Sequence, residues 1–295
     1  MSGQSRAGGR KRPARQSLQE YARGVVGGLL FSLPLIYTME VWWAGFIARP
    51  SHLLLYFGAG FLLLFGYNRY AGLHEDASWW EVAFEAVEEM GLGFLVAAGT
   101  LWLLGRLNAG MPSEEILGKI VVEGVMAAIG VSVGAAQLGN AGGKGNGGSN
   151  QGMKGEENGE EPPGLAAQLV LAACGAVLFA SNIAPTEEIL MIAVETSPWK
   201  ILGLALLSLV LGGVILFQSD FRGSQRQTPD DSRNSFTVAS RITANYAVAL
   251  VTSALILWFF GRFDGMSVGT CVAQTVVLGV AGSLGASAGR LLLQR

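Results

Sequence analysis

Charged and metal-binding side chains are scarce in this chain of 295 residues. Only 14% of the residues are charged, and the 2 histidines, His52 and His74, have no His-x-x-x-His spacing. We therefore expect no histidine-based zinc site. The 2 cysteines, Cys174 and Cys271, both lie in apolar segments. This placement favours a packing role over a disulfide framework or a thiolate metal site.

Motifs for common enzyme chemistry are also missing. The sequence contains no GxxxxGK[ST] nucleotide loop and no Gly-x-Ser-x-Gly elbow. Glu-Glu doublets at 88–89 and 187–188 also occur in intramembrane CAAX-type proteases, but the following arginine and later histidines that such proteases need are absent. We therefore expect no catalytic residues of these classes and no cofactor.

Hydrophobic residues dominate what is present. They make up 51% of the chain, and the mean hydropathy is +0.41. A helix needs roughly 20 apolar residues to cross a bilayer core of about 30 Å. Eight stretches approach this length, which predicts an all-α, polytopic membrane helix bundle; they lie at 24–46, 52–68, 81–105, 116–138, 171–194, 199–217, 237–260 and 268–292.

Basic residues predict the orientation of these spans. Most of the 20 lysines and arginines fall on one side, and the other side holds Arg49, Arg106, Lys119, Lys200 and Arg262. Because cytoplasmic loops are enriched in Lys and Arg, we expect both termini in the cytoplasm. The first span is too long for a secretory signal and lacks an Ala-x-Ala exit, so we expect it to remain in the mature protein.

Two polar stretches divide the chain. Residues 1–20 form a basic tail that we expect in the cytoplasm. Residues 139–166 are rich in Gly, Asn, Lys and Glu and cannot bury enough apolar surface to fold. They are predicted to be a disordered cytoplasmic linker between two membrane segments of four spans each, 21–138 and 167–295.

The two membrane segments resemble each other. At a shift of 148 residues, six residues recur, because Gly27, Leu30, Phe31, Thr38, Glu40 and Pro50 match Gly175, Leu178, Phe179, Thr186, Glu188 and Pro198. Further matches follow in the same order at shifts of 156 and 155. An even number of spans makes such repeats parallel, so we expect a pseudo-twofold axis along the membrane normal and a pathway between the halves.

Ionisable groups at membrane depth are the candidate functional residues, because each is costly unless it is paired or hydrated. Glu40 and Glu188 occupy equivalent repeat positions. Pro185, just before the second of them, removes a helix hydrogen bond and frees carbonyls. The predicted ion or proton pathway comprises Glu40, Glu188, Thr38, Thr186, Asn182 and Glu187.

Two pairings offer a structural role for these side chains. Glu40 is then paired with Arg106, and Glu188 with Arg262, as symmetry-related buried salt bridges. Lys119 and Glu123 are four residues apart on one helix face, and we predict that they form a local pair.

A second acidic cluster lies at the predicted cytoplasmic end of the third span. Glu81, Glu85 and Glu88 share one helix face, and Glu89 lies beside them. Arg241 stands at the position of Glu85 in the other half. Either Glu85 contacts Arg241 across the axis, or this acidic stripe is a solvated helix end.

At 28–43 and 182–188, where the sequence reads GLLFSLPLIYTMEVWW and NIAPTEE, the chain resembles a family of bacterial integral membrane proteins of unknown function. The resemblance covers about residues 20–138 and 168–293 and implies an inner-membrane location. It supplies no activity and no site residues.

The carboxylates themselves predict passage of a small cation or a proton through the bilayer, with no nucleic acid as partner. The alternatives are a non-transporting scaffold or sensor that binds a partner on its cytoplasmic side, and an enzyme acting on lipid; a homo-oligomer is left open.

Overall fold

The computed structural model describes residues 14–71, 78–142, 165–223 and 235–291. Within these ranges every regular element is a helix, which confirms the predicted all-α class. The helices are α1 (Ala14–Ile36), α2 (Met39–Ile47), α3 (Pro50–Ala71), α4 (Trp79–Leu103), α5 (Ser113–Gly142), α6 (Leu165–Ala180), α7 (Glu188–Glu195), α8 (Pro198–Gly223), α9 (Ser235–Phe259) and α10 (Val268–Leu291). Most of the predicted basic tail and of the predicted disordered linker lies outside the described residues.

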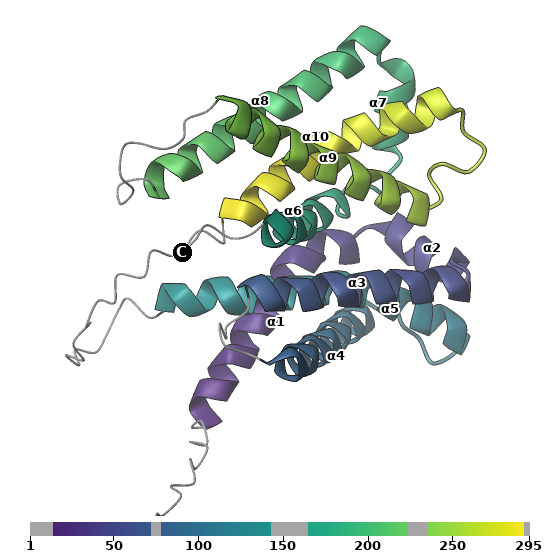
Figure 1. Ribbon diagram of the computed structural model, residues 1–295. Coiled ribbons are helices and arrows are strands. Elements are labelled where there is room, and N and C mark those ends of the chain that lie inside the picture. Colours follow the sequence, from purple (N-terminus) through teal and green to yellow (C-terminus); the bar gives the residue numbers. More distant parts are fainter. Residues whose placement is uncertain (1–13, 72–77, 143–164, 224–234, 292–295) are drawn as a thin grey trace, which may run out of the picture.

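The helices form two groups with the same order of long and short members (Figure 1). In the first half, α1 to α5, the central helix is α5, which packs against α1, α2, α3 and α4. In the second half, α6 to α10, the central helix is α10, which packs against α6, α7, α8 and α9. Each half is therefore a small bundle built around its last helix.

Six of these helices, α3, α4, α5, α8, α9 and α10, are long and apolar enough to cross a membrane. A seventh span results if α1 and α2 are counted together, although they are bent by 86°. The predicted span at 171–194 is divided into α6, with 16 residues, and α7, with 8. The predicted multi-span bundle is confirmed, but the predicted count of eight spans is not.

Tryptophans mark both ends of a complete crossing. Trp79 and Trp80 begin α4 and Trp102 lies near its end, and all three are exposed. With a rise of about 1.5 Å per residue, Trp79 and Trp102 are about 35 Å apart along the helix. This length crosses a hydrocarbon core of about 30 Å and reaches the headgroups, where Trp is enriched in membrane proteins.

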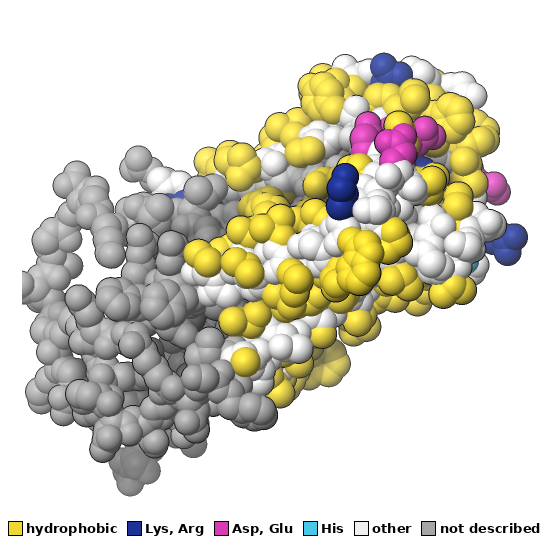
Figure 2. Space-filling view, turned by 90° about the horizontal axis from the view of Figure 1, so that it is seen from above, with side chains coloured by type: hydrophobic (Ala, Val, Ile, Leu, Met, Phe, Trp, Pro, Cys, Tyr) yellow, Lys and Arg dark blue, Asp and Glu magenta, His cyan; other side chains and the backbone are white. Residues whose placement is uncertain are grey.

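The sides of the bundle are apolar. In Figure 2, hydrophobic side chains cover most of the described surface, and the charged ones gather toward one end. Only 11% of the spanning window of α8 is buried, which leaves Leu202, Leu206, Val210 and Val214 exposed. Such a surface is suited to lipid chains rather than to water.

The first helix of each half is interrupted. Pro34, which lacks a backbone N–H, weakens the last turn of α1, and α2 begins after Thr38 in an extended conformation. Thr38 Oγ1 donates to the Pro34 carbonyl at 2.6 Å, and Trp42 Nε1 donates to the Ile36 carbonyl at 2.8 Å. These side chains satisfy carbonyls that the bend exposes. We call the bend at Tyr37 and Thr38, between α1 and α2, the elbow. In the second half, residues 181–187 separate α6 from α7.

Glycines allow the first and last helices of each half to touch through their backbones. A Cβ at Gly27 would clash with the backbone of Gly130, and a Cβ at Gly175 would clash with that of Gly285. These are α1–α5 and α6–α10 contacts at positions related by the sequence shifts. Close approach of this kind is how small residues pack membrane helices.

The ends of α4 and α9 are also built alike. Each is followed by a glycine with a φ of 68°, Gly105 or Gly261, in a left-handed turn that favours glycine. The next residue is an arginine in both cases, and its carbonyl accepts a hydrogen bond from the central helix of the same half. Lys119 Nζ donates at 3.4 Å in the first half, and Gln274 Nε2 donates at 3.2 Å in the second.

The two halves meet mainly along α3 and α6. Val170 of α6 packs over Gly66 of α3, and the Cys174 thiol donates to the Leu63 carbonyl at 3.6 Å. A twofold axis would require α1 and α8 to pack as α6 and α3 do. In the described part of the chain α1 and α8 form no packed pair, so the contact between the halves is one-sided.

Candidate functional site

Glu123 is completely buried inside a membrane-spanning helix. At a rise of about 1.5 Å per residue it lies about 15 Å from the start of α5. Neither carboxyl oxygen has a hydrogen-bond partner among the described residues. Tyr56 of α3 also lies at this level of α5, but its hydroxyl donates to the Val122 carbonyl at 3.2 Å and not to the Glu123 carboxyl group. An anion here is costly, so such a group is neutral or takes up a cation.

The helix neighbours of Glu123 show that it faces the elbow. Residues four before and four after it share its helix face. The backbone of Lys119 packs against Gly45 of α2, and the carbonyl of Ala127 lies against Gly28 of α1. Glu123 is therefore directed to the space between α1 and α2, below their bend.

The predicted pair of Lys119 and Glu123 is wrong. Lys119 Nζ instead bonds to Glu115 Oε1 at 2.6 Å and to the Arg106 carbonyl at 3.4 Å. Both partners lie toward the end of the helix, where the lysine also reaches water more easily. Glu123 is left without a counter-ion from its own helix.

A second buried polar group lies toward the opposite end of the first half. Asn68 Nδ2 of α3 donates to Glu89 Oε2 of α4 at 2.6 Å, and Ser132 Oγ of α5 donates to Asn68 Oδ1 at 2.6 Å. Asn68 and Ser132 are buried, and Glu89 is half-buried. This network joins three helices and lies about 14 Å from Glu123 along α5, at about 1.5 Å per residue.

The rest of the predicted acidic stripe occupies the first turns of α4. Glu81 caps the helix together with Ser78, Glu85 is half-buried and Glu88 is exposed. Arg241, the predicted partner of Glu85, is exposed on α9. Within the described residues α4 packs on α1, α3 and α5, whereas α9 packs on α6, α8 and α10. The structure does not bring Glu85 and Arg241 together.

Glu40 lies at the far side of the elbow, half-buried in the first turn of α2. Its predicted partner Arg106 places its guanidinium over the ring of Trp42, 4.4 Å from the centroid. This is a cation–π contact. No ion pair joins Arg106 to Glu40 in the described part of the chain.

The equivalent residues of the second half lie at the surface. Glu188 begins α7, and both Glu188 and Glu187 are exposed, while Thr186 is half-buried. The helix α7 lies outside the spanning helices. The pKa of Glu188 is lowered from its usual value by its own backbone N–H, and further by Thr186 and by the charge of Arg262. No ion pair joins Arg262 to Glu188 in the described part of the chain, so the predicted salt bridge between them is not formed.

Asn182 lies where the halves approach each other. Its Nδ2 donates to the Leu178 carbonyl of α6 and, at 3.5 Å, to the Phe31 carbonyl of α1. Its Oδ1 is buried and has no partner among the described residues. Asn182 therefore ties the interrupted helix of one half to that of the other.

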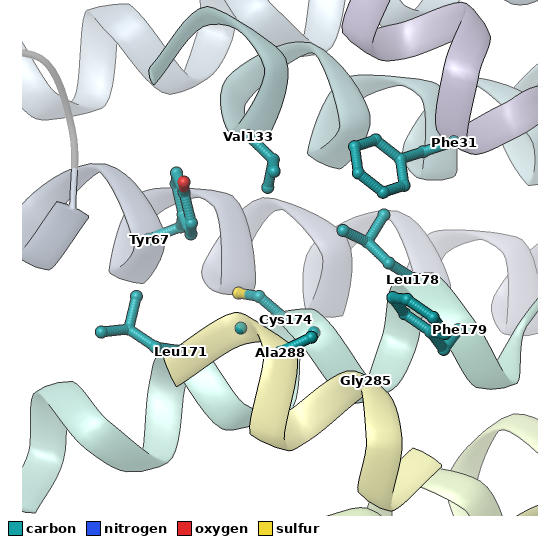
Figure 3. Close-up of a pocket in the computed structure, with 11 residues that line it drawn as sticks. Phe31, Tyr67, Val133, Leu171, Cys174, Leu178, Phe179, Gly285 and Ala288 are labelled. Carbon is teal, nitrogen blue, oxygen red and sulfur yellow. The ribbon is translucent and has the colours of Figure 1, made fainter. Parts of the chain in front are cut away.

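The pocket between the halves is small and apolar. Figure 3 shows Phe31, Tyr67 and Val133 of the first half facing Cys174 and Leu178 of the second. The space is about 20 Å³, enough for roughly one water molecule. The predicted pathway between the halves is therefore narrow here, and none of the predicted pathway residues lines it.

The positions of the buried carboxylates are neutral in the second half. By the sequence shifts, Leu278 matches Glu123, and Asn245 matches Glu89. Leu278 is completely buried, and Asn245 Nδ2 donates to Ser287 at 2.9 Å. At these two positions the second half thus has buried neutral side chains in place of carboxyl groups.

Sequence reasoning missed the network partners Asn68 and Ser132 and misjudged Glu123. A polar residue inside an otherwise apolar span is the signal that was available for Asn68, because such a group needs a buried partner. No spacing rule connects it to Ser132 and Glu89, since the three residues come from three helices.

Comparison with known proteins gives one match. A family model described as "Putative integral membrane protein (DUF2391)" matches residues 20–293. The match includes both halves and leaves out residues 1–19, which include the start of α1, and the last two residues. No curated protein and no solved structure matches the chain.

Proposed function

We propose, from the premise that the chain belongs to this family of integral membrane proteins, that it passes protons across the membrane through carboxyl groups of its first half. The family match confirms the resemblance found in the sequence. The observation that carries the proposal is Glu123, a carboxyl group without a partner inside a spanning helix. Ionisable residues so placed commonly mark ion pathways and proton relays in membrane proteins.

Three carboxyl groups at different depths support a route along the first half. Glu40 lies on α2, which packs against α5, and Glu123 lies on α5 below the elbow. Glu89 of α4 belongs to the network that reaches Ser132, about 14 Å further along α5 at about 1.5 Å per residue. We assign Glu40 to the entrance, Glu123 to the middle and Glu89 to the exit, with transient water molecules connecting them.

A proton fits this arrangement better than a hydrated metal cation. Among the described residues no group of three or more His, Cys, Asp and Glu side chains is placed to hold a metal ion. The pocket between the halves has room for roughly one water molecule. A proton requires only a carboxyl group and a brief file of water, both of which a closely packed helix bundle accommodates.

The same proposal orients the protein. We place α2 and α7 at the outer side of the cell inner membrane and both termini in the cytoplasm, because most Lys and Arg residues then lie inside. The residues Asn182, Thr186, Glu187 and Glu188 form the corresponding outer end of the second half. Leu278 interrupts any route through that half, so these residues contribute less to flux. The proposal includes no enzymatic activity.

Proton flux into proteoliposomes tests this function. The purified protein is reconstituted with a pH-sensitive dye inside the vesicles, and a pH gradient is imposed. The Glu123→Leu variant should lose flux and still fold, because the second half folds with Leu278 at the matched position. Glu114→Gln is the matched control, since Glu114 is exposed in the first turn of α5, and its flux should equal that of the wild type.

Two further variants distinguish the contributions of the two halves to proton flux. Glu40→Gln should slow flux because it removes the entrance group, whereas Glu188→Gln should leave most of it. Wild-type protein without flux, or Glu123→Leu protein with full flux, would overturn the proposal. A scaffold or sensor that binds its partner through Glu85 and Glu88 would then be the better interpretation.

A further inference from the structure

The central helices of the two halves are unequally covered. In α5, 78% of the spanning window is buried, but in α10 only 39% is buried. Six positions that are buried in α5 are half-buried at their matches in α10, and four of these share one helix face, namely Val280, Ala281, Leu284 and Ala288. The second half thus has an uncovered strip along its central helix.

In the first half the matching strip of α5 is covered partly by α3, since Val125 packs over Gly60, and partly by α6, which lies beside Val133. The helix α6 lies against α3 and α5, and Phe31 of α1 faces it from the other side (Figure 3). The matching groove of the second half is bordered by α6, α8 and α10. We call it the α10 groove. No helix fills it in the described part of the chain, and Figure 1 shows α8 at the edge of the molecule, away from the first half.

The counterpart of α6 is α1, and its matching face is exposed. By the shift of 148 residues, Ala22, Val26 and Leu30 of α1 correspond to the α6 residues Val170, Cys174 and Leu178, which lie at the contact between the halves. Val26 is 53% exposed and Leu30 is 65% exposed, whereas Cys174 and Leu178 are buried. One face of α1 is therefore unused within the chain.

The residues of the α10 groove are complementary in size to this face. In the existing contact, Val170 packs over Gly66. At the matching positions the groove has Val214 and the exposed face of α1 has Ala22. In the existing contact the larger residue is on the inserted helix α6, and in the α10 groove it is on the groove wall α8. A large residue still faces a small one, so α1 fits the groove at the same distance between helices.

We propose that the α10 groove binds α1 of a second copy of this chain, so that the contact between copies repeats the contact between the halves. The chain's own α1 is not the occupant, because it is held on α4 and α5 of the first half. Each copy supplies one groove and one α1, and a symmetric dimer that fills both grooves is the smallest closed assembly of this contact. This inference stands independently of proton passage.

Cysteine cross-linking in lipid nanodiscs or liposomes tests the dimer. In a chain with Cys174→Ala and Cys271→Ala, one preparation carries Val26→Cys and a second, tagged preparation carries Leu211→Cys. These positions match Cys174 and Leu63, which touch in the existing contact. After co-reconstitution, a short thiol cross-linker should join the two preparations into a product of twice the chain mass.

Two controls make the result decisive. Leu63→Cys in a chain that keeps Cys174 should cross-link within one chain and shows that the reagent reaches this depth. Val251→Cys, exposed on another face of the second half, should give no product with Val26→Cys. If the internal control links but the mixed pair does not, lipid fills the groove and the proposal is overturned.

The mass of the assembly gives a second measurement. Val214→Trp should convert dimers to single chains in mild detergent, because the enlarged side chain blocks the groove. Val251→Trp should leave the dimer intact. A wild-type protein with the mass of one chain in both detergent and nanodiscs would also overturn the proposal.

Discussion

The two halves share a helix arrangement but differ in what they bury. The central helix of the first half buries Glu123, and that of the second half buries Leu278 at the matched position. Because the second half packs with a leucine there, the fold does not need a carboxyl group at this depth. The proposed passage of protons gives Glu123 a role outside packing.

The arginines after α4 and α9 show the same divergence. Arg106 lies over Trp42, while the positive charge of Arg262 helps to lower the pKa of Glu188. The residue that matches Trp42 in the second half is Leu190, which offers no aromatic face. Arg106 therefore contacts an aromatic ring, whereas Arg262 has no aromatic residue at the matching position.

The largest expected effect tests whether the halves are packed alike. Gly27→Leu and Gly175→Leu should each cost more than the ~1–3 kcal/mol usual for overpacking, because the new side chain meets backbone. We expect loss of the monodisperse protein peak in both cases. Gly91→Leu is the control, since a Cβ there meets nothing within 4 Å. Tolerance of either contact-breaking variant would show that the two halves pack differently.

The next effect concerns the buried carboxyl group. Glu123→Leu should raise the free energy of unfolding by about 1–3 kcal/mol, because it removes a buried polar group without a partner. Leu278→Glu should lower it by a similar amount. Thermal unfolding in detergent measures both changes. A destabilised Glu123→Leu protein would mean that the carboxyl group has a structural partner.

A smaller effect is expected at the elbow. Trp42→Leu places the second-half residue in the first half and removes the ring under Arg106. The coupling between Trp42 and Arg106 in a double-mutant cycle should be about 0.5–1 kcal/mol, the size of an exposed cation–π contact. Leu190 and Arg262 should show no such coupling, and equal values in the two halves would contradict the comparison.

The smallest effect concerns the serines of the central helices. Ser132→Ala removes the donor to Asn68, and Ser287→Ala removes the acceptor for Asn245. Hydrogen bonds between membrane helices contribute about 0.6 kcal/mol on average. We expect both variants to lose about this much stability. A loss confined to Ser132→Ala would mark the network around Glu89 as the more important one.

The sequence predicts the spanning helices better than their interruptions. The apolar stretches at 52–68, 81–105 and 116–138 correspond to α3, α4 and α5, since length and hydropathy alone decide such helices. The stretches at 24–46 and 171–194 have the same composition but are divided in the structure. Hydropathy does not register the local hydrogen bonds of Thr38 and Trp42 that stabilise the bend.

The candidate site was harder to predict. Lys119 has an acidic residue four positions away on each side, Glu115 and Glu123, and the sequence gives no reason to choose between them. The structure decides for Glu115 because the neighbouring Arg106 carbonyl lies toward the same end. The predicted pathway role of Glu40 and Glu188 stays a prediction, and their burial differs, since Glu40 is half-buried and Glu188 is exposed.

The tryptophans at both ends of α4 have a mechanical consequence. A helix anchored at two interfaces stands upright in a thick bilayer and tilts in a thin one. Because Glu89 of α4 is bonded to Asn68 of α3, a change of tilt alters the geometry of that hydrogen bond. We therefore expect the thickness of the surrounding bilayer to affect the polar interior of the first half.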